Sequence, residues 1–285
     1  MSIVSPLLTR DVALELAAAS DGGATSVECS LDLRRSRERV LLPPATDATA
    51  RAFEWRGRRY PLPDTLRDRT VYAWNGESFE PVSRYAGALI KLVPTDWGPP
   101  TFEIDGIKML PTARVSPLED ARRKVALVEP RGRRLLDTCG GLGYFAVAAL
   151  EAGAAHVQSF EKNADVLWLR TINPWSPREE ARLTLTHADV TARIGALPAR
   201  SVDAVLHDPP RFGIAGELYS QAFYDELARV LVPRGRLFHY TGTPNRLTSG
   251  RDVPGEVLAR LTRAGFDARR ALDGVLAIRR SASRG

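Results

Sequence analysis

Four residues that could do chemistry stand together in the sequence, namely Asp208, Pro209, Pro210 and Arg211. They directly follow an apolar run at residues 202–207 that has the composition of a buried strand. Two consecutive prolines each fix φ near about −65° and remove a backbone donor, so the strand must stop there with its last groups held in one direction. This acidic corner is either a strand terminator or the floor of an active site.

A glycine-rich turn, LDTCGGLG at residues 136–143, follows another predicted strand. Glycines such as Gly141 and Gly143 let the backbone pass close to a ligand, and the helix that starts after them offers free N–H groups to a carboxylate or phosphate. Asp137, at the end of the strand, can accept a hydrogen bond from a ligand ammonium group. The turn indicates either an adenosine-type cofactor site or only a tight connection.

Two more acids end predicted strands. Glu161 lies about 20 residues after the glycines, where an acid can bind both ribose hydroxyls of a nucleoside. Asp189 ends the next strand and can accept a hydrogen bond from an adenine amino group. Each acid alone would be an ordinary surface carboxylate, but open α/β sheets bind ligands at the carboxyl ends of their strands. We therefore predict a cofactor site that includes Lys162 and Val190, which directly follow these acids.

The elements that must position these residues alternate between short apolar runs and helical patterns from residue 133 onward, as in βα units that build a parallel sheet. The predicted strands are 133–138, 156–162, 183–188, 202–207, 236–240, 268–272 and 275–279. The predicted helices are 144–152, 164–171, 255–264 and one with apolar positions at Phe223, Leu227, Val230 and Leu231. A further helix over 117–127, with Ser116 as its cap, leads into the first strand. The fold class is α/β with a Rossmann-like sheet.

Residues 1–110 differ from this pattern, because they hold many prolines, short strand-like pieces and turn pairs such as Asn75-Gly76. We expect a smaller β-rich or α+β domain there, with a possible role in substrate recognition, and a second domain over residues 111–285.

The motifs DTCGGLG, FEK, HAD and HDPPRF resemble the class I S-adenosylmethionine-dependent methyltransferases. More narrowly, DTCGGLGYFAVAALEAGA, FEKN, NPWSP, HDPPRFGIAGELYSQAFY and GRLFHYTGTPN resemble an uncharacterised family of predicted methyltransferases known mainly from archaea, as do FEIDGIKML and EDARRKV upstream. The resemblance covers the chain from about residue 100. It implies a seven-stranded sheet with a reversed final hairpin, S-adenosylmethionine as cofactor, and contacts from Asp137, Gly141, Gly143, Glu161 and Asp189. The class has glycine where this chain has Cys139, a predicted contact to which the glycine's role does not carry over.

The resemblance also gives the acidic corner a role. Class members that modify exocyclic or side-chain nitrogens end the fourth strand with Asp or Asn, then Pro-Pro and an aromatic residue. Their carboxyl or amide group and backbone carbonyl accept hydrogen bonds from the target amine, whose lone pair then points at the methyl carbon. By resemblance, Asp208 aligns the amine, and Pro209 and Pro210 hold the carbonyls. Arg211 stands in the place of the aromatic residue and is predicted to hold a substrate phosphate or carboxylate.

Several residues could remove the proton that the amine loses, because they are predicted near strand ends at the same edge. These are His207, His239, Tyr240 and Thr241, although a structural role for the histidines is the favoured interpretation. Cysteine is absent near the corner, which argues against covalent attack on a pyrimidine C5. Other roles stay open: Glu217 and Tyr219 as a lid, and Asn173, Pro174 and Trp175 as a wall of the adenine site or a helix cap.

Composition limits the remaining possibilities. A net charge of +6 suits an anionic partner such as RNA, although an arginine excess of this kind also reflects a GC-rich genome or a hot habitat. Two cysteines predict neither a disulfide framework nor a metal site. No apolar run is long enough to cross a bilayer and no secretory leader is visible, so we expect a soluble, cytoplasmic protein without a membrane partner. The alternatives to nitrogen methylation of RNA are methylation of a protein or small metabolite, aminopropyl transfer from decarboxylated S-adenosylmethionine, and non-catalytic RNA binding.

Overall fold

A computed structural model describes residues 5–44, 51–178, 180–211, 213, 215–242 and 252–281. The chain forms two compact units. The N-terminal unit contains Met1–Pro117 and Trp168–Trp175, and the C-terminal unit contains Leu118–Leu167 and Ser176–Gly285. The described part of the chain has no helix both long and apolar enough to cross a bilayer.

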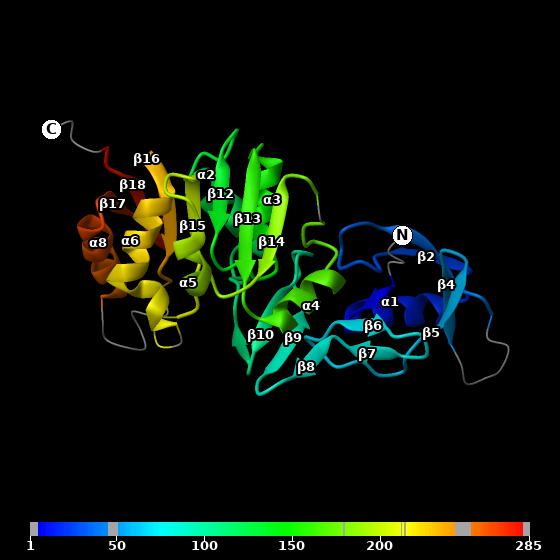
Figure 1. Ribbon diagram of the computed structural model, residues 1–285. Coiled ribbons are helices and arrows are strands. Elements are labelled where there is room, and N and C mark those ends of the chain that lie inside the picture. The colour runs from blue at the N-terminus through cyan, green and yellow to red at the C-terminus, as the bar shows by residue number, and fades with distance from the viewer. Residues whose placement is uncertain are drawn as a thin grey trace. The chain divides into compact units, whose positions relative to one another are not determined.

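The C-terminal unit is built on one seven-stranded sheet with the order β14-β13-β12-β15-β16-β18-β17 (Figure 1). Its strands are β12 (Arg134–Asp137), β13 (His156–Glu161), β14 (Leu183–His187), β15 (Val202–His207), β16 (Leu231–Tyr240), β17 (Phe266–Ala271) and β18 (Gly274–Arg279). The first five strands of that order are parallel to their neighbours, whereas β18 is antiparallel to both β16 and β17. The predicted Rossmann-like sheet with its reversed final hairpin is confirmed.

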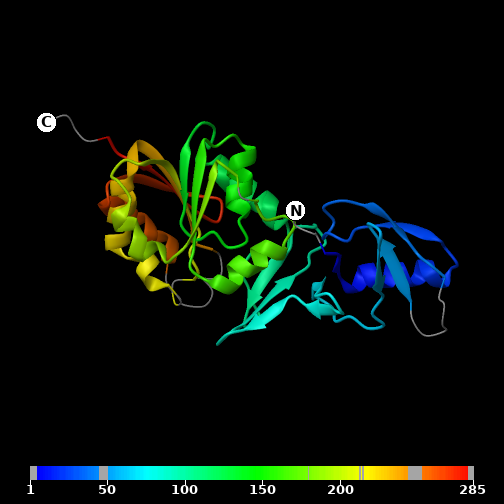
Figure 2. The same ribbon diagram turned by 45° about the vertical axis from the view of Figure 1, so that its right-hand side comes forward.

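Helices cover both faces of this sheet. The helices of this unit are α2 (Pro117–Ala126), α3 (Tyr144–Glu151), α5 (Val190–Arg193), α6 (Gln221–Val230) and α8 (Val253–Arg263), with short 3-10 turns η1 (Ile194–Ala196) and η2 (Gly216–Tyr219). Helix α4 (Ala164–Ile172) starts in this unit, and its residues from Trp168 onward belong to the N-terminal unit. Side chains of α5, α6 and α8 form one apolar core with Leu136, Phe160 and Val205 of the sheet. The alternate strand residues, such as Leu135 and Leu206, are also buried, since parallel strands are covered on both faces. Figure 2 shows α3 on the face opposite α6 and α8.

Strand β16 starts earlier than the pattern predicts. Its pairing with β15 jumps from Leu231 beside Val202 to Arg236 beside Ala204, so the intervening residues form a bulge rather than a turn before the strand. At Gly235 a Cβ would lie 2.8 Å from both a Leu231 side-chain carbon and the Val232 carbonyl oxygen. Only glycine fits there, and the pattern of Pro233 and Gly235 therefore marks a bulge within a strand.

The N-terminal unit is β-rich with one long helix, α1 (Arg10–Asp21). Three small sheets have the orders β1-β6-β7, β2-β3-β4-β5 and β11-β10-β9-β8. Their strands are β1 (Leu7–Leu8), β2 (Ser26–Cys29), β3 (Glu38–Leu41), β4 (Ala52–Trp55), β5 (Arg58–Pro61), β6 (Tyr72–Trp74), β7 (Phe79–Pro81), β8 (Ser83–Tyr85), β9 (Leu89–Val93), β10 (Thr101–Ile104) and β11 (Ile107–Lys108). Leucine and aromatic side chains form the core, and the rings of Phe53 and Tyr60 stack with centroids 5.3 Å apart.

The segment Trp168–Trp175 belongs to the N-terminal unit although it follows β13 in the sequence. The Trp175 indole N–H donates to the Leu33 carbonyl over 2.9 Å, and Arg35 donates to the Pro174 carbonyl. The Arg84 guanidinium lies 3.8 Å from the ring centroid of Trp168. The interactions of Pro174 and Trp175 thus lie within the N-terminal unit.

Candidate active site

Four acids lie at the carboxyl ends of four neighbouring parallel strands. In sheet order these are Asp189 after β14, Glu161 at the end of β13, Asp137 at the end of β12 and Asp208 after β15. Asp137 is in register with Leu206, which places Asp208 two positions beyond it along the neighbouring strand. Because these strands are parallel, all four acids stand on one edge of the sheet, which is the ligand-binding edge of open α/β sheets.

Asp137 is fully buried, and its Oδ2 accepts a hydrogen bond of 2.8 Å from the Ser159 hydroxyl. Ser159 lies on β13 in register with Asp137, so the parallel pairing itself fixes the orientation of the carboxylate. A buried carboxylate held in this way is a strong acceptor for an ammonium group.

The glycine turn has the backbone that close approach requires. Gly141 and Gly143 have φ of 50° and 86°, and Gly143 caps α3, which starts at Tyr144. Cys139 is not among the described residues with positive φ, which explains why a side chain is tolerated where the methyltransferase class has glycine. Burial, reinforced by the charge of Glu161, raises the pKa of the Cys139 thiol well above its usual value. This cysteine is therefore a neutral thiol rather than a nucleophile.

Glu161 links the end of β13 to the glycine turn. Its Oε2 accepts from the Gly141 N–H over 2.9 Å, and its Oε1 accepts from the Asn163 N–H over 2.8 Å. A carboxylate has about four lone-pair sites, so each oxygen keeps one site for a further donor. Two vicinal hydroxyl groups match these two sites.

Asp189 is the cap of α5, and its Oδ1 accepts from the backbone N–H and the hydroxyl of Thr191 over 2.9 and 2.7 Å. Its Oδ2 lies 3.6 Å from the half-exposed Lys162 ammonium. Burial alone would raise the pKa of Asp189, but the bonds from Thr191 and the charge of Lys162 lower it. Val190 is buried in the core, which leaves only its backbone groups for a ligand.

The acidic corner, residues 208–211, is contacted by η2. The Tyr219 hydroxyl donates to the Pro210 carbonyl over 3.1 Å, and Tyr219 is almost fully buried. Tyr219 is thus a fixed part of the corner, whereas the exposed Glu217 lies 3.9 Å from Lys162. Arg211 is exposed, and Phe212 lies outside the described residues. Asp208 and the prolines remain the groups that can face a substrate.

The two strand-end histidines have structural partners on every ring nitrogen. His207 has the Leu218 carbonyl at 3.1 Å from Nε2 and the Thr138 hydroxyl at 2.7 Å from Nδ1. His239 has the Tyr240 carbonyl at 2.8 Å from Nδ1 and the Tyr224 hydroxyl at 2.9 Å from Nε2. A carbonyl requires a donor, so the nitrogen that faces it carries a proton, and in the neutral ring the other nitrogen accepts from the hydroxyl. Burial lowers the pKa of His207 to about 4 and that of His239 in the same direction. Neither is placed to act as a base.

A buried ionic cluster beside the corner was not predicted from the sequence. The Lys124 ammonium on α2 lies 2.6 Å from Asp120 Oδ2 and 3.3 Å from Asp273 Oδ2. Burial raises the pKa of Asp208 to about 7; Lys124 opposes this shift, and Asp120, Asp273 and Asp137 add to it. The spacing of Asp120 and Lys124 on one helix is visible in the sequence, but their burial and the third partner, in the β17–β18 turn, are not.

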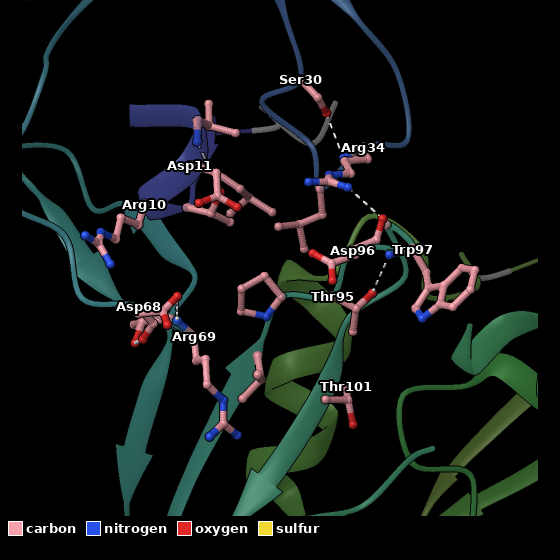
Figure 3. Close-up of a pocket in the computed structure, with 18 of the residues that line it drawn as sticks. Arg10, Asp11, Ser30, Arg34, Asp68, Arg69, Thr95, Asp96, Trp97 and Thr101 are labelled. Carbon is pink, nitrogen blue, oxygen red and sulfur yellow. Dashed lines mark hydrogen bonds between the residues drawn. The ribbon is translucent and has the colours of Figure 1, made fainter. Parts of the chain in front are cut away.

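A cavity of about 530 Å³ lies elsewhere, within the N-terminal unit (Figure 3). It is lined by the start of α1 and by the loops around residues 30–37, 68–70 and 93–98. Five of its lining residues are cationic and four are acidic: Arg10, Arg34, Arg37, Arg69 and Lys108, and Asp11, Glu15, Asp68 and Asp96. This mixture provides no uniform field that would select a phosphate backbone.

Comparisons with known proteins agree with this fold. No family model matches the chain. An uncharacterized protein of Methanocaldococcus jannaschii is 46% identical over 178 residues, which are 62% of this chain and 61% of that protein, so the match spans less than two thirds of the relative. Spermidine synthase in complex with the transition state analogue AdoDATO has a TM-score of 0.57 at 14% identity over 69% of this chain and 72% of that one. MNMC2 from Aquifex aeolicus has a TM-score of 0.51 at 19% identity over 70% and 72%. The C-terminal unit has the Rossmann-like methyltransferase fold.

Proposed function

We propose that the chain is an S-adenosylmethionine-dependent methyltransferase that acts on nitrogen, with Asp208, Pro209 and Pro210 aligning the target amine. The observation that carries this proposal is the row of acids along one edge of four adjacent parallel strands. Three of these acids could bind three parts of the methyl donor, and the fourth, Asp208, lies beside them and could bind the amine that accepts the methyl group.

The residues at this edge of the sheet could bind S-adenosylmethionine group by group. Asp137 would accept from its ammonium, the free lone pairs of Glu161 from its ribose hydroxyls, and Asp189 from its adenine amino group. The amino-terminal N–H groups of α3, beyond the left-handed Gly143, would bind its carboxylate. When bound, this donor supplies an electrophilic methyl group on a sulfonium.

Asp208 would then hold the incoming amine and take its proton. Transfer forms an N–C bond as the S–C bond breaks, the electron pair stays on sulfur, and the nitrogen gives up one proton. A carboxyl group whose pKa burial has raised to about 7 is matched to accept a proton at neutral pH. The prolines fix the direction of this group, and orientation is the main requirement of an in-line displacement.

RNA is the substrate that we propose first, because the net charge of +6 favours a polyanion. A protein or small-metabolite amine is the alternative acceptor. Aminopropyl transfer from decarboxylated S-adenosylmethionine is a second candidate, and it is favoured by Asp120 and Asp273 close to Asp208, since carboxylates suit a cationic amine. The likeness in fold to spermidine synthase supports the same candidate. Arg211, which was predicted to hold a substrate phosphate or carboxylate, is exposed.

The test is label transfer. The protein is incubated with S-adenosylmethionine labelled on its methyl carbon and with RNA, protein and small-molecule fractions from a strain that lacks it. Calorimetry with this donor and with its decarboxylated form separates the two reactions, because a methyltransferase should bind the carboxylated donor more tightly.

Asp208→Ala is expected to abolish transfer while donor affinity changes less than about threefold, because Asp208 contacts the acceptor and not the donor. Asp267→Ala, a matched change at an exposed position of β17, should leave both unchanged. Loss of donor binding in Asp208→Ala would contradict the assigned role.

A further inference from the structure

Lys124 is a buried and ion-paired side chain in a place where lysine is rarely found. It is 2% exposed, and its ammonium is held by groups from three separate elements. Asp120 lies one turn before it on α2, Asp273 comes from the turn between β17 and β18, and the ring centroid of Tyr240 at the end of β16 is 4.2 Å away. The position of this charge is thus fixed by the fold.

The Lys124 ammonium lies beside the acidic corner. His207 and His239 are in register on the parallel strands β15 and β16, so the residues that follow them, Asp208 and Tyr240, come side by side at the edge of the sheet. Lys124 lies over that Tyr240 ring. Burial opposes the charge on Lys124, yet its pKa is raised, and Asp208 is the largest of the charges that raise it, ahead of Asp120 and Asp273.

We propose that Lys124 is a positioning residue of the transfer site, whose fixed ammonium favours the carboxylate form of Asp208, so that this carboxylate can accept a proton and hydrogen bonds from the substrate amine. This role rests on the proposed function. Lys124 acts through Asp208 and need not touch the substrate.

The charge balance around Asp208 gives the direction of each effect. The groups that face it are Lys124 and Asp120 from α2, Asp137 and Cys139 from β12 and its turn, Tyr219 from η2, Tyr240 from β16, and Asp273. The tyrosines and the thiol are neutral at pH 7, since burial raises the pKa of each. Three carboxylates and burial therefore favour the protonated form of Asp208, and among these groups Lys124 is the cation that opposes them.

Stability alone gives no clear reason to bury this lysine. Removing two or more charges from water costs free energy that a buried ion pair often fails to recover, and apolar replacements can be neutral or stabilising. A role in controlling the charge of the neighbouring acid accounts for the lysine at this position.

The test measures the titration midpoint of the Asp208 carboxyl carbon by ¹³C NMR in the donor-free protein, assigned by its loss in Asp208→Asn. In Lys124→Met the midpoint should rise by about one unit or more, a tenfold change in proton affinity. In Asp120→Asn it should fall, because a repelling carboxylate is removed. Lys124→Arg, which restores the charge, should remain close to the wild type. Arg122→Met, an exposed change on the same helix, should have no effect.

These opposite shifts cannot come from loosened packing, which would move both variants the same way. A midpoint in Lys124→Met or Asp120→Asn that equals the wild type would overturn the proposal. If Lys124→Met does not fold by circular dichroism, the sign of the shift in Asp120→Asn decides alone. The acid limb of the pH profile of transfer should move with the midpoint, and a limb that stays in place while the midpoint moves also overturns it.

The NMR measurement needs no substrate. A protein that transfers nothing from either donor would refute the proposed function, while the titration would still show whether Lys124 controls Asp208.

Discussion

Replacing Asp208 by Asn should stabilise the C-terminal unit above neutral pH and have little effect in acid. Burial raises the pKa of this carboxyl from 3.8 to about 7. A folded-state pKa above the unfolded value means that the acid contributes its full stability below about pH 4 and loses it as the pH rises to about 7. The Asn side chain has a similar shape and carries no charge at either pH.

The magnitude follows from the same shift. About three pKa units at about 1.4 kcal/mol each give about 4 kcal/mol as an upper value, which solvent near the partly exposed carboxyl reduces to about 2–4 kcal/mol. Lys124 keeps Asp120 and Asp273 as partners in the variant, so no cation is left without a counter-charge.

The assay is urea unfolding followed by far-ultraviolet circular dichroism at several pH values between about 4 and 8. Tryptophan fluorescence would be the wrong probe, because all five tryptophans lie in the N-terminal unit. Asp267→Asn serves as the surface control. If the free energy of unfolding of the Asp208→Asn variant stays parallel to that of the wild type across this range, the argument from burial is refuted.

Three further measurements test the site. Glu161→Gln should weaken S-adenosylmethionine binding about tenfold or more by calorimetry, because an amide cannot accept from two N–H groups and two hydroxyls at once; unchanged affinity would exclude Glu161 as a contact. Gly143→Ala should cost about 1–2 kcal/mol of unfolding free energy, because φ of 86° is left-handed, while Gly195→Ala in open space should cost much less. In ¹⁵N NMR, His207 should stay neutral with its proton on Nε2 down to about pH 5, since its pKa is lowered to about 4; protonation near pH 6 would contradict the proposed tautomer.

The sheet could be predicted from the sequence because its information is local. Apolar runs such as residues 202–207 are what a strand buried on both faces requires, and the intervening helices force the strands to be parallel. The acids at strand ends were found for the same reason, since parallel pairing brings every carboxyl end to one edge. The prediction for β16 missed the bulge before Arg236, because proline and glycine give the same signal for a turn and for a bulge.

The ionic cluster could not be predicted because its members meet only in the tertiary structure. Asp120 and Lys124 are four residues apart on a helix whose other charged pairs, such as Arg123 with Glu119, are exposed. Nothing in the spacing distinguishes a buried pair from a solvated one. Asp273, about 150 residues away in the sequence, completes the cluster only when the final hairpin forms.

The placement of Trp168–Trp175 limits how this protein can be dissected. A single cut near residue 117 would yield an N-terminal fragment that lacks Trp175, whose indole donates to the Leu33 carbonyl. The C-terminal fragment would contain Trp168 and Trp175 without Arg84 and Leu33, their partners in the intact chain. Neither fragment contains a complete unit, so neither could be transferred to another protein as an independently folding domain. Ribosomal synthesis must also pass residue 175 before the first part of the chain can complete its fold.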